Sequence, residues 1–311
     1  MQTRVFNFQP HSFKSETQEF SQSFSYWHIF NLFFFFKTLF PPMNTKNILA
    51  AGLCFVSALS FTSCSKESES LTKSDEVSKE VLSQIKQLGF TSQGAMAVEG
   101  GYIVEGDIFL TPQDLANPSP VKLMRVGAEE QYRTTNLVNA GTGRNITISV
   151  STSLPAAYVT ATDEMIARYN AENLTLSMTR VSSGGDIVLA QAPKSARYLA
   201  SAGFPTSAGD PHNQVLINSG AIGTANPTTY IATILAHEVG HCIGFRHTDY
   251  MDRSYSCGGS TSNEGASTVG AILIPGTPAA ADPNSFMLAC IGGGQNRPFN
   301  SNDKTALNAL Y

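Results

Sequence analysis

The feature that most constrains this chain is a short run between positions 237 and 247, which contains His237, Glu238, His241, Gly244 and His247 and holds half of the six histidines of the chain. On a helix, His237 and His241 leave the same face because they are four residues apart. That spacing suits two ligands of one tetrahedral zinc ion. Glu238 lies beside these ligands, where a carboxylate can polarise a water.

The end of the run explains how a third ligand can join the first two. Gly244 can take the left-handed backbone conformation that ends a helix without a Cβ clash. The chain can then turn back and bring His247 to the metal. Three neutral imidazoles leave one position open for a water. The sequence therefore predicts one catalytic zinc ion held by His237, His241 and His247, with Glu238 as general base and acid.

The run matches H-E-x-x-H-x-x-G-x-x-H at every fixed position, and Met287 follows His247 by 40 residues in the sequence Ser285-Phe286-Met287. The chain thus resembles the metzincin zinc endopeptidases, whose Met-turn places a methionine beneath the three histidines. The stretches Arg246–Asp249 and Asn300–Asp303 make it most similar to the bacterial dual-action HEIGH metallopeptidases, with Val239 in place of the isoleucine of that signature. The resemblance covers about residues 75–311.

The resemblance implies a metzincin-like α+β fold. We expect a twisted mixed β-sheet, a backing helix, the zinc-binding helix, and the Met-turn in the lower subdomain. Hydrophobic patterning agrees with that order. It predicts a strand over 102–110 with a break at Gly106, a strand over 145–150, a helix that Thr160 and Asp163 begin, strands at 174–178, 186–190 and 214–217, and a zinc helix that opens at Asn226-Pro227.

An export signal is predicted ahead of the folded part. Met43 begins a second, better start, with Lys46 and then a short apolar stretch over 48–61. Phe61-Thr62-Ser63-Cys64 resembles a bacterial lipobox, so residues 43–63 are predicted to be a lipoprotein signal peptide and Cys64 the lipidated cysteine. An ordinary secretory signal is the alternative. Residues 1–42 are then an upstream extension without structure, or else an unusual leader.

The exported part divides by composition into three segments. Residues 64–74 are rich in serine, lysine and glutamate and are predicted to be a solvated tether. Residues 75–130 are either a small N-terminal subdomain or a removable pro-segment, and 131–311 are the metallopeptidase catalytic domain. From Cys64 onward, 16 basic residues stand against 22 acidic ones, a net charge of −6. We therefore expect no binding of nucleic acid. The expected partner is a peptide or protein substrate, and the protein is expected to be a monomer.

Cysteine usage fits an exported protein. Cys257, Cys290 and Cys242 remain once the signal and lipid cysteines are set aside, an odd number in an oxidising compartment. We favour a Cys257–Cys290 disulfide with Cys242 as a buried thiol, and Cys242–Cys290 is the alternative. No cysteine lies between 64 and 242, so a pro-segment thiolate that caps the zinc is not expected.

Some side chains near the motif have two readings. Asp249 is either a hydrogen-bond partner of a ligand histidine or a surface aspartate. Tyr250 and Tyr255 are packing residues or donors to the oxyanion, because Ala289 stands where some metzincins have a tyrosine. The acids Glu264 and Asp282 lack the spacing of a calcium loop.

The predicted function is a zinc-dependent endopeptidase anchored to a bacterial membrane by lipid on Cys64. Its substrates are extended peptides that pair with an edge strand beside the cleft. The alternative from another class is a non-catalytic cell-surface binding lipoprotein with a retained zinc site. Glu238 argues against that alternative, since a structural zinc site has no use for a base. A hydrolase of non-peptide substrates also fits the motif.

Overall fold

The computed structural model describes residues 76–116, 131–266, 269–278 and 281–311, all within one compact unit that spans 71–311. The predicted extension (1–42), signal peptide (43–63), lipidated Cys64 and tether (64–74) lie outside the described residues. In the part that the structure describes, no helix has the length and apolar character needed to span a bilayer.

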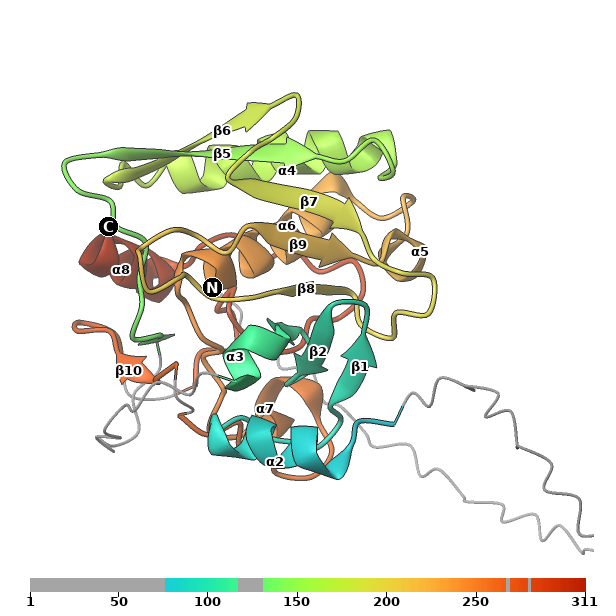
Figure 1. Cartoon of the computed structure of the whole chain (residues 1–311). Helices are drawn as coiled ribbons and strands as arrows, with labels where there is room; N and C mark the ends of the chain where they lie inside the picture. Colours follow the sequence, from blue (N-terminus) through green and yellow to red (C-terminus); the bar gives the residue numbers. More distant parts are fainter. Residues whose placement is uncertain (1–75, 117–130, 267–268, 279–280) are drawn as a thin grey trace, which may run out of the picture. The chain divides into compact units, whose positions relative to one another are not determined.

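One mixed β-sheet of eight strands forms the centre of the fold (Figure 1). Its strand order is β1-β2-β3-β8-β9-β7-β5-β6. Strands β6, β5, β7 and β9 are parallel, and β8 turns antiparallel to β9. The strands are β1 (Met96–Val98), β2 (Gly101–Val104), β3 (Ile108–Leu110), β5 (Arg144–Val150), β6 (Leu176–Val181), β7 (Ile187–Gln191), β8 (Ala200–Ala202) and β9 (Gln214–Ile217).

Two long helices, α4 (Ala156–Asn170) and α6 (Thr228–Ile243), pack against each other and against the sheet. Figure 1 shows them on the same side of strands β5 to β9. The main hydrophobic cluster lies in this layer and holds Ile146, Met165 and Leu235, each fully buried. The predicted start of α4 at Thr160 is wrong by about one turn. The helix begins directly after Pro155, because proline fixes a φ that suits a first helical turn.

Shorter helices and a second, small sheet complete the fold. A two-stranded sheet joins β4 (Tyr132–Arg133) to β10 (Ile272–Leu273). Helix α8 (Ser301–Leu310) begins with a capping box between Asn300 and Asp303. The other helices among the described residues are α2 (Lys79–Gln87), α3 (Pro112–Ala116), α5 (Ser219–Ile222) and α7 (Ser254–Cys257). Together these observations confirm the predicted α+β architecture.

The described part of the N-terminal segment, residues 76–116, extends the main sheet. The strand predicted over 102–110 is in fact a hairpin, with β2 and β3 antiparallel and Val104 opposite Ile108. Strand β3 then pairs with β8, where Ile108 lies opposite Ala202. The segment has a hydrophobic cluster of its own, and the main cluster includes no described residue before Val138. The domain boundary near residue 131 stays a prediction.

Candidate active site

Helix α6 bears the first two predicted ligand histidines, His237 and His241, and is buried in the core. Every residue from Tyr230 to Ile243 is buried, as expected of a helix that is apolar around most of its circumference. The helix ends at Gly244, which has φ of +113° and donates its amide hydrogen to the carbonyl oxygens of Gly240 and His241. This left-handed residue turns the chain back, and His247 returns to the helix.

The three predicted ligand histidines converge. Nε2 of His241 lies 3.1 Å from Nε2 of His237 and 3.2 Å from Nε2 of His247. The Nδ1 atoms point outward to acceptors: Phe286 O for His237 (2.9 Å), Phe245 O for His241 (2.8 Å) and Glu264 Oε1 for His247 (2.7 Å). A carbonyl or carboxylate oxygen accepts, so each Nδ1 atom donates its proton, and in the neutral tautomer of each ring Nε2 is then available to bind a metal.

This arrangement fits a bound zinc ion. In the neutral tautomer the Nε2 lone pairs cannot hydrogen-bond to one another, although Nε2 of His241 lies within 3.2 Å of the other two, so a cation among them would stabilise the cluster. Nitrogens at the usual zinc distance in a tetrahedron are roughly 3.3–3.4 Å apart, close to the observed spacing. The Nδ1 hydrogen bonds fix the tautomer that metal binding needs.

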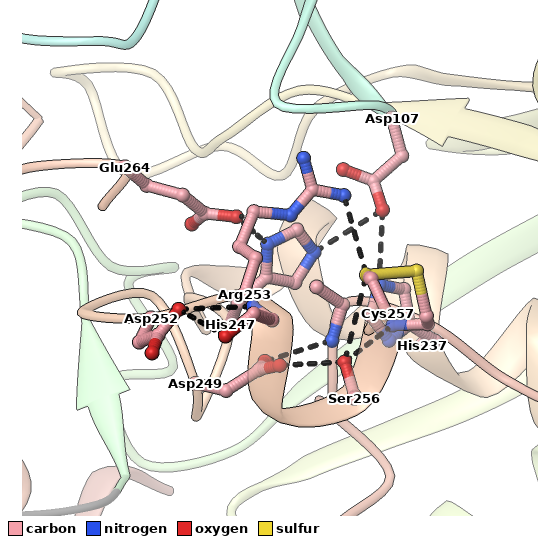
Figure 2. The surroundings of a disulfide bond; sticks show 12 residues. Asp107, His237, His247, Asp249, Asp252, Arg253, Ser256, Cys257 and Glu264 are labelled. Carbon is pink, nitrogen blue, oxygen red and sulfur yellow. Dashed lines mark hydrogen bonds and ion pairs between the residues drawn. A yellow bond between two sulfur atoms is a disulfide. The ribbon is translucent and has the colours of Figure 1, made fainter. Parts of the chain in front are cut away.

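A fourth donor, Asp107, lies at the same cluster and was not predicted. Its Oδ2 atom is 3.1 Å from Nε2 of His247 and 3.4 Å from Nε2 of His237. Asp107 and the three histidines are all buried, and their ligand atoms lie within 4.8 Å of one another. In Figure 2 its carboxylate points from the N-terminal segment toward the His237 and His247 rings.

The Met-turn lies against the α6 helix next to the second histidine. A Cβ atom added to Gly240 would lie 2.6 Å from Sδ of Met287, so the glycine allows this close approach. Met287 O accepts a hydrogen bond from the amide of Thr248. Asp303 of α8 holds the turn by accepting from the Ser285 hydroxyl and the Phe286 amide.

Cys257 and Cys290 form a disulfide, and Cys242 is a buried free thiol. The alternative pairing of Cys242 with Cys290 is therefore not formed. The bond links the end of α7 to the irregular segment that follows the Met-turn, close to Asp107 and His237 in Figure 2.

The expected partner of a ligand histidine is a different acid from the one considered. Asp249 is buried, so it is not a surface residue, but it accepts hydrogen bonds from the Ser256 hydroxyl and the Ala289 amide instead of a histidine. Glu264 accepts from His247, and both side chains are fully buried. No periodic pattern marks the irregular stretch around Glu264, so sequence reasoning had no signal for this role.

A buried ion-pair network lies behind the histidines. The Arg246 guanidinium is 1% exposed and lies 3.1 Å from Glu105 and 3.5 Å from Glu264. Burial, and then repulsion by Glu264, raise the pKa of Glu105, while Arg246 opposes that change. The aromatic rings of Phe90 and Tyr250 face the same guanidinium at 5.6 and 5.7 Å.

Glu238 opens onto a cavity beside the histidines. The cavity has a volume of about 260 Å³, and its walls include His237, Ile234, Leu288 and Tyr198. Glu238 is 3% exposed, and its Oε2 atom has no hydrogen-bond partner among the described residues. Burial is the main cause that raises the pKa of Glu238, followed by the nearby Asp107 carboxylate.

The two tyrosines considered as oxyanion donors do not line this cavity. Tyr250 packs edge-on against Tyr132 and faces Arg246, and the Tyr255 hydroxyl donates to Ala281 O. Tyr198, which sequence reasoning missed, does line the cavity, and its buried hydroxyl has no hydrogen-bond partner in the described part of the chain. No motif or periodic pattern in the sequence singled it out.

We compared the chain with known proteins and protein families. No curated protein matches the chain. Two solved structures of myroilysin are similar to it: one at 12% identity over 55% of this chain and 82% of that chain, with a TM-score of 0.36, and one at 14% identity over 66% and 98%, with a TM-score of 0.35. A family model described as a dual-action HEIGH metallo-peptidase matches residues 103–311. Since that match covers more than half of the chain and takes in the histidine helix and the Met-turn, this chain belongs to the dual-action HEIGH metallopeptidase family and has its metzincin-like fold.

Proposed function

We propose that this metallopeptidase is a zinc endopeptidase in which Glu238 acts as general base and then general acid. One observation carries the proposal: a buried carboxylate with an unpartnered oxygen faces a cavity next to three convergent histidines. A burial cost of this kind is tolerated where the group has a chemical role.

The residues divide the chemistry between them. Zinc, when bound by three neutral imidazoles, supplies an activated water and polarises a carbonyl. His237, His241 and His247 would hold it, each oriented through its Nδ1 atom. Glu238 accepts the proton of the attacking water and returns it to the leaving amine. The raised pKa of Glu238 makes it a stronger base than an exposed glutamate.

The cavity suits one substrate side chain. Its apolar wall comes from Ile234, Leu288 and Ala289, and the Arg253 and Arg297 side chains complete the rim. A volume of about 260 Å³ is small for a whole ligand and sufficient for a residue of a bound peptide. The substrate main chain would pair with strand β8, on the side that β3 occupies in this structure.

We also propose that the enzyme is exported and anchored to a bacterial membrane by lipid on Cys64, and that it acts as a monomer. The Cys257–Cys290 disulfide supports an oxidising compartment. The short apolar stretch that ends at the lipobox supports lipidation. The competing function, a binding lipoprotein with a retained zinc site, leaves the buried Glu238 without a role.

The test pairs zinc content with hydrolysis. The full chain and Glu238→Ala are purified in detergent, assayed for bound metal, and incubated for a long period with casein. We expect stoichiometric zinc in both proteins, and hydrolysis that is lost in the variant and on chelation. Absence of zinc from the wild-type protein would sink the proposal. Zinc in both proteins with equal, chelator-insensitive hydrolysis would also exclude it.

A further inference from the structure

The tip of the β2–β3 hairpin carries an unusual set of features. Three residues, Glu105, Gly106 and Asp107, connect the two strands. Glu105 and Gly106 both have positive φ, +55° and +94°. For a residue other than glycine this conformation costs about 1 kcal/mol or more, so the surroundings must hold Glu105 in place.

Buried contacts provide that hold. Glu105 is 1% exposed, and its Oε2 atom accepts from Arg246 at 3.1 Å. Arg246 directly precedes the third ligand histidine, so this ion pair fastens the hairpin tip beside the metal cluster. A Cβ atom on Gly106 would lie 2.9 Å from the Arg253 guanidinium, so this residue is also tightly confined.

The same tip directs Asp107 at the histidines. Its Oδ2 atom lies 3.1 and 3.4 Å from two of the three Nε2 atoms. The other oxygen, Oδ1, is buried and has no hydrogen-bond partner among the described residues. A carboxylate at this point would serve as a fourth ligand to a zinc ion held by the histidines, in the position that a catalytic site keeps open for water.

The hairpin also covers the strand that a substrate needs. The amide of Ala202 in β8 donates to Asp107 O at 3.0 Å, and Ile108 lies opposite Ala202 in the parallel β3–β8 pair. Gly106 and Asp107 line the cavity next to Glu238. One short turn therefore supplies a donor to the histidine cluster, pairs with the edge of β8 and lines one end of the cavity.

The segment contacts the catalytic part through two small hydrophobic clusters, one of which joins its fully buried Ile103 to Ala192 and Tyr198. The other cluster draws on Ile85, Leu88 and Leu110, with Phe204 and Val269 as the contributions from beyond residue 131. The main core under α4 and α6 takes no described residue from it. Loss of the segment would leave the main core complete.

From this geometry we propose that the N-terminal segment keeps the enzyme latent, with Asp107 as a removable fourth zinc ligand and β3 as a strand that blocks β8. The proposal rests on the proposed peptidase function. Activation requires that the β2–β3 tip leave the site, whereupon the fourth position and the edge of β8 become available together.

Binding of a metal-directed probe tests this without measuring catalysis. The full chain carrying Glu238→Ala, which prevents self-cleavage, is loaded with Co²⁺ and titrated with acetohydroxamate while the visible spectrum is recorded. Asp107→Ala and Asp107→Asn are compared in that background. The matched control is Asp114→Asn, an exposed aspartate of the same segment in helix α3.

We expect both Asp107 variants to bind the probe more tightly than the parent and the control. If Asp107 leaves the metal in about 1% of molecules, removing it raises the apparent affinity about 100-fold. Equal affinity in all four proteins would overturn the proposal. The asparagine variant keeps the side-chain shape, so it serves if the alanine variant does not fold.

A second readout separates this proposal from the peptidase proposal. With Glu238 intact, Asp107→Ala should hydrolyse casein faster than the wild-type chain. If the variant gains probe affinity and never hydrolyses casein, the role of Asp107 as a zinc ligand is supported and the peptidase function is excluded. If it hydrolyses casein no faster and gains no probe affinity, the enzyme stands and the latency proposal is excluded.

Discussion

Replacing Glu264 is expected to weaken zinc binding, because this side chain holds the third ligand histidine. Its Oε1 atom lies 2.7 Å from Nδ1 of His247, and both side chains are fully buried. Removing a residue that hydrogen-bonds to a metal-ligating side chain typically lowers metal affinity by about 10- to 100-fold. In Glu264→Gln the amide oxygen still accepts the hydrogen bond and only the charge is lost, so we expect about tenfold, or about 1.4 kcal/mol.

Glu264→Ala should approach the upper end of that range. It removes both the charge and the acceptor, so zinc affinity should fall by about 100-fold, or about 2.7 kcal/mol. It also deprives Arg246 and Arg253 of a carboxylate at 3.5 and 3.0 Å, so the protein should unfold more readily. Near-ultraviolet circular dichroism must therefore show that the variant is folded before its zinc affinity is compared.

The assay is competition for zinc with a chromophoric chelator at fixed pH, in the Glu238→Ala background. Asp249→Asn is the matched control, because Asp249 is a buried acid two residues after His247 that contacts Ser256 and Ala289 and no ligand histidine. Its zinc affinity should stay within about threefold of the parent. If Asp249→Asn weakens zinc as much as Glu264→Gln does, the assignment of Glu264 is wrong.

Three further outcomes follow from other parts of the structure. Replacing Cys257 and Cys290 by serine should lower the free energy of unfolding by about 3–4 kcal/mol, given the separation of 33 residues, and an unchanged urea midpoint would contradict this. Burial lowers the pKa of His212 from 6.5 to about 4, so between these two pH values only the unfolded state takes up the proton. The free energy of unfolding should therefore fall by about 3 kcal/mol as the pH drops from 6.5 to about 4. His212→Gln should remove this contribution to the pH dependence of stability. Arg246→Met should cost about 3–5 kcal/mol in urea denaturation because Glu105 stays buried without its partner, and part of this loss should return in the double variant with Glu105→Gln.

The zinc helix could be predicted because its information is local. His237, Glu238, His241 and Gly244 act through helical spacing and one left-handed cap, and both depend on neighbouring residues alone. His247 follows Gly244 by three residues, so its position also depends on local sequence. The start of α4 was misplaced because Thr160 and Asp163 resemble a cap, whereas Pro155 already sets the first turn.

The carboxylates around the histidines could not be predicted in the same way. Asp107 precedes His237 by 130 positions and reaches it through a hairpin turn and the pairing of β3 with β8. Glu264 lies in a stretch without periodicity, and its position depends on two arginines that it contacts. Gly106 was the one local sign, since a break within a strand pattern can mark a turn.

The hydrogen bonds at the outer nitrogens divide the three histidines into two kinds. Those of His237 and His241 go to main-chain carbonyl oxygens, which every amino acid supplies, whereas that of His247 goes to a side chain. Neighbouring positions can therefore vary over evolution without disturbing the first two rings. In a redesign of this site for another metal, the basicity of a ligand ring can be changed through its hydrogen-bond partner only at His247, by substituting Glu264.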